Sequence, residues 1–220
     1  VIVMVDKSTG IRQLEDSDYA PDTLERFRQT LKLPHGIILV TGPTGSGKSS
    51  TLYSALNELN QPNINIITVE DPVEYQLAGI NQVAVNADVG LTFAAGLRSI
   101  LRQDPNVVMV GEIRDGETAE IAIRAAMTGH MVLSTLHTNS AVSTINRLLD
   151  MGVDTFLVAN ALSGVLAQRL VRCICSNCKT TVHPSVEEEI FLKHYQAEGK
   201  ALYTGLGCNK CGVTGYKGRM

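Results

Sequence analysis

The stretch GPTGSGKSS, residues 42–50, constrains the fold of this chain more than any other part of its sequence. The pattern G-x-x-x-x-G-K-[ST] is met by Gly42, Gly47, Lys48 and Ser49, with an apolar run before it and a helix-like run after it. Glycines let such a loop wrap a phosphate with its backbone N–H groups, and the following helix adds its positive end. A glycine-rich turn with a solvated lysine is the alternative, but the flanking runs favour a loop that holds a nucleoside triphosphate.

This phosphate-binding loop predicts the contacts of the nucleotide and of its metal ion. Lys48 would span the β- and γ-phosphates, and the Ser49 hydroxyl would ligate Mg²⁺. ATP and Mg²⁺ are therefore the expected ligands. The predicted nucleotide-binding residues of the loop are Gly42, Pro43, Thr44, Gly45, Ser46, Gly47, Lys48, Ser49 and Ser50.

Short apolar runs alternate with segments of helical periodicity along most of the chain. The apolar runs are residues 37–41, 64–69, 106–111 and 131–135, and the helical segments are 21–33, 48–59, 93–103, 117–128, 141–151 and 155–170. Near-continuous apolar strands that alternate with helices are typical of a mostly parallel sheet covered on both faces. The sequence therefore predicts an α/β fold.

Composition excludes several classes of protein. The chain has 44% hydrophobic residues, enough for a real core, and 19 basic against 22 acidic residues. This near balance argues against a protein that coats nucleic acid or an acidic membrane, although a local basic groove stays open. No apolar stretch reaches the roughly 18 residues of a spanning helix, and no signal-peptide pattern opens the chain, so we expect a cytosolic protein.

Carboxylates follow two of the predicted strands. Glu70, Asp71 and Glu74 come after the second strand, and Glu112 comes directly after the third. The latter position is the one from which an acid reaches the Mg²⁺ shell in nucleotide hydrolases, usually as aspartate. A single acid after a strand is often only a solvated turn, but two such groups in one sheet favour a catalytic interpretation.

Histidines and arginines supply further candidates. His130 and His137 flank the fourth strand, where a histidine is more often a core group than a catalyst, but either could sense a γ-phosphate. Arginines on helices are usually solvated, yet they can also act as fingers that grip phosphate. The candidates are Arg98 and Arg102, four residues apart on one predicted helical face, and Arg114, Arg147 and Arg219.

The cysteines form two C-x-x-C pairs, Cys175 with Cys178 and Cys208 with Cys211, and 29 residues separate the pairs. Two such pairs are typical of a tetrahedral Zn²⁺ site, because each supplies two thiolates and the intervening loop need only fold back. Four reduced thiols without metal are the alternative, and disulfides are disfavoured in the cytosol. Cys173 lies outside this pattern.

Taken together, these segments resemble the secretion ATPases that drive type II secretion and type IV pilus assembly. The resemblance extends from about residue 36 to residue 219. It rests on the phosphate-binding loop, ITVEDPVEY, LRQDPNVVMVGEIRD, TGHMVLSTLHTN and the paired C-x-x-C motifs, in that order. It implies a RecA-like P-loop NTPase core with a small zinc-binding subdomain. In that family ITVEDPVEY is similar to the aspartate box, VVMVGE to an atypical Walker B motif and TGHMVLSTLHTN to the histidine box.

The resemblance also assigns roles to single residues. It gives Lys48 the phosphates, Glu74 the activation of the attacking water, and Ser49 and Glu112 the Mg²⁺ shell. His130 and His137 become nucleotide-sensing or structural groups. The five arginines become candidates for phosphate or inter-subunit contacts. The cysteine motifs are similar to those of the assembly branch of the family and favour export or extension over retraction.

Family members are ATP-hydrolysing homo-hexamers that act with a membrane-embedded platform protein and a cytosolic adaptor domain, at the inner face of the bacterial inner membrane. On that basis we expect four parts: residues 1–35, the trailing edge of an N-terminal domain and linker; 36–172, the ATPase core; 173–211, the zinc subdomain; and 212–220, a return to the core. No nucleic acid is expected. The alternatives are a RecA-like nucleic-acid translocase, which salt-dependent DNA binding would reveal, and a nucleotide switch without turnover, against which Glu74 and Glu112 argue.

Overall fold

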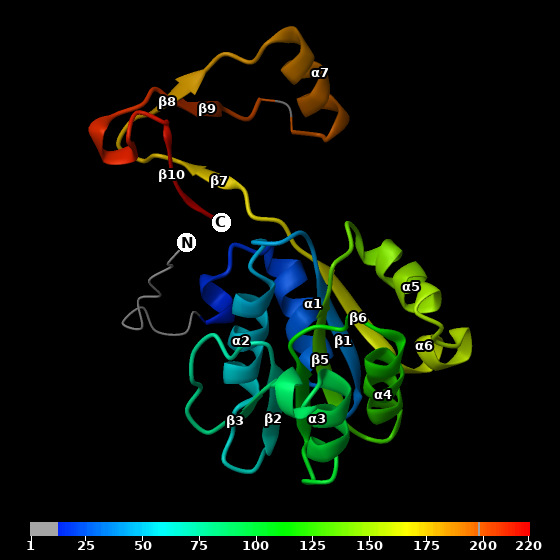
Figure 1. The fold of residues 1–220 in the computed structure, drawn as a ribbon. Coiled ribbons are helices and arrows are strands. Elements are labelled where there is room, and N and C mark those ends of the chain that lie inside the picture. The colour runs from blue at the N-terminus through cyan, green and yellow to red at the C-terminus, as the bar shows by residue number, and fades with distance from the viewer. Residues whose placement is uncertain (1–12, 198) are drawn as a thin grey trace. The chain divides into compact units, whose positions relative to one another are not determined.

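The computed structural model describes residues 13–197 and 199–220, and the chain divides into two compact units, unit 1 up to Arg169 and unit 2 from Leu170 (Figure 1). Of the predicted range 1–35, the first twelve residues lie outside the described part. In chain order the elements of unit 1 are η1 (Leu14–Asp16), α1 (Pro21–Leu31), β1 (Gly36–Thr41), α2 (Lys48–Leu59), β2 (Ile66–Glu70), β3 (Asn81–Ala84), η2 (Ala87–Val89), α3 (Phe93–Ile100), β4 (Val107–Val110), α4 (Gly116–Met127), β5 (Met131–Leu136), α5 (Ala141–Asp150), α6 (Thr155–Ala161) and β6 (Leu162–Ala167).

Unit 1 contains a six-stranded sheet in the order β3-β2-β4-β5-β1-β6, and every neighbouring pair in it is parallel. The α/β fold predicted from the sequence is therefore confirmed. The register of β1 on β5 runs from Gly36 opposite Met131 to Thr41 opposite Leu136. Because all strands point the same way, the segments that follow them meet at one edge of the sheet, which we call the carboxyl edge.

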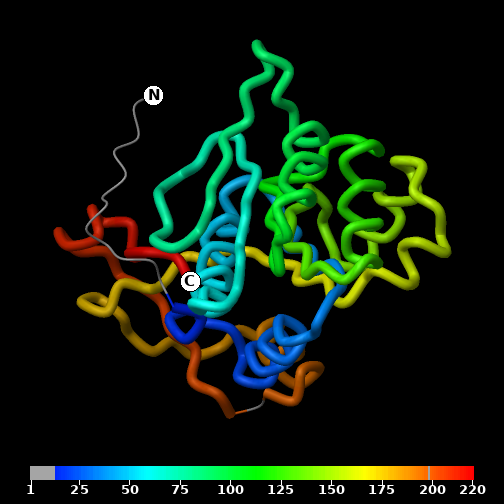
Figure 2. Tube along the Cα trace, turned by 90° about the horizontal axis from the view of Figure 1, so that it is seen from below, coloured from blue at the N-terminus to red at the C-terminus, as the bar shows by residue number. Residues whose placement is uncertain are grey.

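Two hydrophobic cores lie on opposite faces of this sheet, because successive side chains of a strand alternate between its faces. Ile37 and Leu39 of β1 contribute to the core that contains α3 to α6, whereas Ile38 and Val40 contribute to the core that contains α1 and α2. The two helical layers can be followed in Figure 2, with α1 and α2 in blue to cyan and α3 and α4 in green. Burial on both faces explains the near-continuous apolar runs of the strands.

One predicted element is wrong. The segment 155–170 is not a single helix, because α6 ends at Ala161 and the chain continues as β6, which pairs with β1. The period of a short apolar run such as residues 162–167 fits a helix and a buried strand equally well. Pairing with β1 makes this run a strand. Gly36 of β1 makes the close approach possible, since a Cβ at that position would lie 1.9 Å from the Ser163 hydroxyl oxygen.

Unit 2 consists of two small antiparallel sheets and one helix. Its elements are β7 (Arg172–Ile174), β8 (Lys179–Val182), α7 (Val186–His194), β9 (Leu202–Gly205), η3 (Asn209–Cys211) and β10 (Tyr216–Arg219). β7 pairs with β10, and β8 pairs with β9. Residues 212–220, expected from the sequence to return to the core, therefore contribute a strand to unit 2. None of the helices in the described residues has both the length and the apolar character needed to cross a membrane.

Candidate nucleotide site and cysteine cluster

A cleft of about 460 Å³ opens at the carboxyl edge of the sheet. The phosphate-binding loop follows β1, Asp71 follows β2, Glu112 follows β4 and His137 follows β5, and all of them line this cleft. Adjacent parallel strands thus bring together groups that lie as far apart in the sequence as Thr44 and His137. Such an edge is where open α/β sheets bind ligands.

The phosphate-binding loop has the backbone conformation that its glycines permit. Gly45 and Gly47 have φ angles of 74° and 85°, in the left-handed region, and Gly47 is the N-cap of α2. At Gly42 a Cβ would lie 2.3 Å from the carbonyl oxygen of Gln168, so the close approach of these two segments requires glycine. The loop therefore leads directly into the N-terminus of α2, where a phosphate is favoured.

Lys48 is held against this loop. Its Nζ donates to the carbonyl oxygens of Gly42 at 3.0 Å and of Pro43 at 3.1 Å, and the side chain is buried. Burial lowers the pKa of Lys48, because the charged form loses hydration, while the Glu112 carboxylate acts in the opposite direction. A phosphate in the cleft would offer this ammonium a stronger partner than two carbonyl groups.

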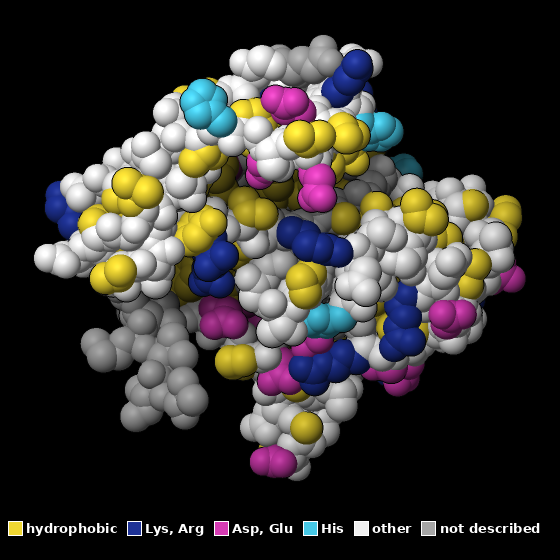
Figure 3. All heavy atoms as spheres, turned by 90° about the horizontal axis from the view of Figure 1, so that it is seen from above, with side chains coloured by type: hydrophobic (Ala, Val, Ile, Leu, Met, Phe, Trp, Pro, Cys, Tyr) yellow, Lys and Arg dark blue, Asp and Glu magenta, His cyan; other side chains and the backbone are white. Residues whose placement is uncertain are grey.

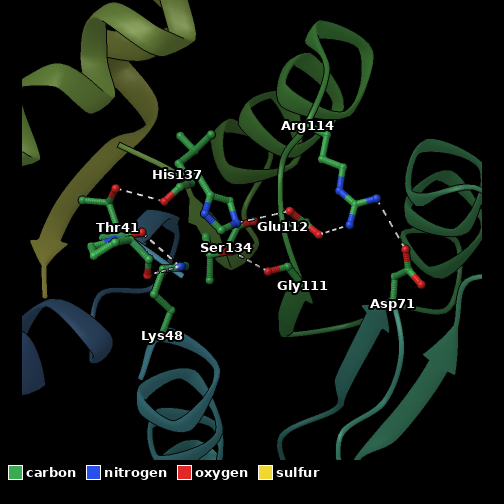
Figure 4. Close-up of polar contacts among 12 residues, drawn as sticks. Thr41, Lys48, Asp71, Gly111, Glu112, Arg114, Ser134 and His137 are labelled. Atoms are coloured by element: carbon green, nitrogen blue, oxygen red, sulfur yellow. Dashed lines mark hydrogen bonds and ion pairs between the residues drawn. The ribbon is translucent and has the colours of Figure 1, made fainter. Parts of the chain in front are cut away.

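Glu112 lies between two cationic or potentially cationic groups (Figure 4). Arg114 donates to its Oε1, and the Nε2 of His137 lies 3.5 Å from its Oε2, with the side chain 19% exposed. Arg114 also approaches Asp71, at 3.5 Å, so one guanidinium bridges the acids that follow β2 and β4. The hydrogen bond to Glu112 raises the pKa of Arg114.

The backbone around Glu112 is fixed from both neighbouring strands. The N–H of Gly111 donates to the carbonyl of Val69 at 2.8 Å, and its own carbonyl accepts from the Thr135 hydroxyl at 2.8 Å. The N–H of Ile113 donates to the carbonyl of Thr135 at 3.0 Å. These bonds hold the Glu112 carboxylate at the wall of the cleft.

Glu70 and Glu74 differ sharply in environment, although both line the cleft. Glu70 is buried and accepts hydrogen bonds from the hydroxyls of Tyr53 and Thr68 and from Gln82, the last at 3.0 Å. Its oxygens are thus occupied by neutral donors. The Glu74 carboxylate is exposed and, within the described residues, has no hydrogen-bond or ion-pair partner, so it can meet a water molecule in the cleft.

Tyr53 connects these two glutamates. Its hydroxyl donates to Glu70 and accepts from the backbone N–H of Glu74 at 3.2 Å. Burial and the bond to Glu70 raise the pKa of Tyr53 well above its ordinary value, so the hydroxyl stays a donor at any physiological pH. It therefore positions the segment that carries Glu74.

Tyr53→Phe is expected to lower the free energy of unfolding by about 1–3 kcal/mol, because the buried Glu70 loses one of its donors. Urea unfolding followed by circular dichroism measures the change. Tyr75→Phe is the matched control, since Tyr75 packs edge-on against the Tyr53 ring and its loss of a hydroxyl leaves the Glu70 contacts in place. Equal effects of the two substitutions would contradict the role given to the Tyr53 hydroxyl.

Several predicted nucleotide-binding residues of unit 1 do not line the cleft. His130 precedes β5, at the edge opposite the phosphate-binding loop, and its Nδ1 lies 3.0 Å from the Ala125 carbonyl. Arg98 pairs with Glu117 of α4, and Arg102 lies in a turn, because α3 ends at Ile100 rather than at residue 103. Arg147 is exposed on α5, and Arg219 belongs to unit 2. Arg114, by contrast, contacts two acids at the carboxyl edge, Glu112 and Asp71.

Sequence reasoning missed two residues at this site. Tyr53 looked like an ordinary member of the amphipathic helix, and Gln168 lay in a segment expected to be helical. A signal for Gln168 would have been its place directly after a strand, but that required β6 to be recognised first. The side chain of Gln168 donates to the Ser46 carbonyl at 2.7 Å.

The four cysteines of the two C-x-x-C pairs converge in unit 2. Their sulfur atoms all lie within 4.8 Å of one another, and three of the Sγ–Sγ distances are 3.9, 3.9 and 3.7 Å. A disulfide would require about 2.05 Å. Four thiolates at about 2.3 Å from a tetrahedral Zn²⁺ would lie about 3.8 Å apart, so the cluster fits this ion.

Comparisons with known proteins agree with these observations. A family model described as "Type II/IV secretion system protein" matches residues 1–220. The type II secretion system ATPase E of Vibrio cholerae is 52% identical over 219 residues, which cover all of this chain and 44% of that protein. The type IV pilus assembly ATPase PilB of Thermus thermophilus is 52% identical over 221 residues, which cover all of this chain and 25% of that protein. The chain thus spans less than half the length of these relatives.

Solved structures of similar fold are also motors or ATPases by name. A crystal structure of the pilus retraction motor PilT with bound ADP matches with a TM-score of 0.67 and 35% identity, over 89% of this chain and 52% of that one. The ATPase DotB of Legionella pneumophila matches with a TM-score of 0.63 and 31% identity, over 73% of this chain and 47% of that one. By its sequence over the whole length and by its fold, the chain belongs to the family of type II/IV secretion system proteins.

Proposed function

We propose that this chain is the ATP-hydrolysing part of a type II secretion or type IV pilus assembly motor. The observation that carries the proposal is the cleft at the carboxyl edge of the sheet. There the phosphate-binding loop faces an exposed carboxylate, Glu74, and a fixed one, Glu112. A site that only bound Mg-nucleotide would need the loop and one acid for the metal ion, but not a second carboxylate open to water. The names of the relatives, which are ATPases, support the same activity.

In the proposed reaction, water attacks the γ-phosphorus of ATP, and the bond to the β-γ bridging oxygen breaks to leave ADP and phosphate. Glu74 accepts the proton of the water, and Lys48 offsets the charge on the β- and γ-phosphates. Ser49 and Glu112 would hold Mg²⁺, which neutralises phosphate charge when bound. His137 and Arg114 keep Glu112 oriented, and the His137 side chain itself lines the cleft.

We further propose that the protein works as a homo-hexamer. In each subunit a partner domain closes over the ATP bound at the phosphate-binding loop and reopens once the γ-phosphate is lost. A membrane-embedded platform protein and a cytosolic adaptor domain would receive this motion at the inner face of the bacterial inner membrane. Arg98, Arg102 and Arg147 stay candidates for contacts between subunits, since they do not line the cleft of unit 1. Arg219, in unit 2, stays a candidate for the same role. The cysteine cluster, with Zn²⁺, favours export or pilus extension.

The alternative of a nucleic-acid translocase finds no support in the charge pattern. On the face in Figure 3, Asp and Glu side chains are exposed as well as Lys and Arg side chains. The formal net charge is −3. Tight binding of a nucleic acid backbone depends on concentrated positive charge.

The proposed activity is tested by measuring binding and turnover separately. We expect the 220-residue chain to bind Mg-ADP, and we expect its ATP hydrolysis to be about 10³-fold slower than that of a version extended at its N-terminus, because arginines supplied by a closing partner have effects of that size. Calorimetry and a steady-state assay over a range of protein concentrations measure the two quantities.

Lys48→Ala is the control for this test and should abolish binding in both versions of the protein. If both versions have equal specific activity at every concentration, the 220-residue chain contains the whole catalytic site, and the proposed closure of a partner domain over ATP is wrong. If Lys48→Ala binds Mg-ADP with unchanged affinity, the phosphate-binding loop has another role.

A further inference from the structure

Gln168 is the first residue after β6, and its backbone continues the pairing of that strand with β1. Its N–H donates to the carbonyl of Thr41 at 2.8 Å, and its own carbonyl is the atom that would clash with a Cβ at Gly42. The residue therefore lies against the start of the phosphate-binding loop. Because β6 is the strand next to β1, this contact arises from the strand order alone.

The carboxamide of Gln168 makes three further hydrogen bonds. Nε2 donates to the carbonyl of Ser46 at 2.7 Å, while Oε1 accepts from the hydroxyls of Thr51 and Tyr19, each at 2.8 Å. The same two hydroxyls lie 2.9 Å from each other. One side chain thus joins the loop, the first turns of α2 and the segment before α1.

Ser46 is a buried residue of the loop. It is only 2% exposed, so water has little access to the position that the Gln168 amide occupies. Its N–H donates to the Pro43 carbonyl at 3.2 Å, and Gly45 and Gly47 on either side have left-handed φ angles. Two flexible residues therefore flank a peptide whose carbonyl is held by Gln168.

We propose that Gln168 is a positioning residue for nucleotide binding, which fixes the phosphate-binding loop through the Ser46 carbonyl and is itself oriented by Tyr19 and Thr51. The inference rests on the proposed function of the loop. A carboxamide is suited to this task because it donates from one end and accepts two bonds at the other. Glutamate could accept both hydroxyl bonds but could not donate to the carbonyl. Since Gln168 contacts neither Glu74 nor Glu112, its effect belongs to binding rather than to the chemical step.

Hydrogen exchange of the 220-residue chain without nucleotide tests the positioning role first. In Gln168→Met, which is similar in volume but makes none of the side-chain bonds, the amides of residues 44–47 should exchange about tenfold faster, while those of β4 and β5 stay unchanged. Gln103→Met, an exposed turn position, is the matched control and should leave both regions unchanged. Unchanged exchange in residues 44–47 would overturn the inference whatever the nucleotide assays show.

Kinetics then separate positioning from a merely structural effect. Gln168→Met should raise the KM for Mg-ATP and the Kd for Mg-ADP about tenfold, with kcat within about twofold of the original chain. Tyr19→Phe should have a smaller effect alone and add nothing in the Gln168→Met background, because both act through one contact. A loss of kcat at constant KM, or additive effects, would contradict the proposal.

Gln168→Glu covers the case in which Gln168→Met does not fold, since it keeps the acceptor atom for Tyr19 and Thr51. It should still weaken Mg-ADP binding. If the unaltered chain itself binds no Mg-ADP, the proposed function fails, and the exchange measurement still decides whether Gln168 holds the loop.

Discussion

Glu74→Gln is expected to lower the turnover of Mg-ATP by about 10²-fold or more while Mg-ATP binding stays within about threefold. The exposed Glu74 carboxylate is the acid of the cleft that can accept a proton from water, and glutamine keeps its size while losing its basicity. Binding should survive because the phosphate-binding loop and Glu112 are unchanged. The measurement is steady-state hydrolysis together with calorimetry, in the N-terminally extended version whose activity is highest.

Glu112→Gln should behave differently, because this carboxylate is the proposed Mg²⁺ ligand. We expect it to slow hydrolysis and also to weaken the dependence of nucleotide binding on Mg²⁺. It also replaces the charged partner of Arg114 with a neutral amide, so that Asp71 is the remaining carboxylate beside that guanidinium. Glu117→Gln, which alters an exposed acid paired with Arg98, is the control for the loss of one charge. Normal hydrolysis by Glu74→Gln would show that Glu112 or another group activates the water.

The second large effect concerns the cysteine cluster. We expect the purified chain to carry about one Zn²⁺, and its removal by a chelator to unfold unit 2 while unit 1 keeps its structure. Among the described residues of unit 2, the buried hydrophobic side chains are Cys175 and Cys211, both of them members of the cluster. The cluster is thus the centre of this unit, and zinc-finger peptides gain about 10–16 kcal/mol from such an ion.

Elemental analysis and hydrogen exchange measure these two outcomes. Cys178→Ser should lower the zinc content and increase exchange across residues 172–219, whereas Cys173→Ser, outside the cluster, should change neither. A chain purified without chelators that holds no zinc and shows all five of its cysteines as titratable thiols would exclude the metal. The cluster would then be four reduced cysteines.

The sequence by itself determined the features that depend on neighbouring residues in the chain. The phosphate-binding loop, the acids after β2 and β4 and the two C-x-x-C pairs were all found from local spacing, because a loop conformation or a pair of metal ligands is set within a few residues. The α/β class followed from the same local periodicity. The family was also identified at this stage, since its motifs occur in order along nearly the whole chain, and the comparisons confirm it.

Only the tertiary structure decided which of these groups meet. The two histidines of one motif lie at opposite ends of β5, so the direction of the strand brings His137 to the cleft and leaves His130 at the far edge. The order of the strands brings Arg114 to two acids, and the pairing of β6 with β1 turns a predicted helix into the strand that delivers Gln168. Strand order and direction depend on burial against distant segments, and no local pattern contains that information.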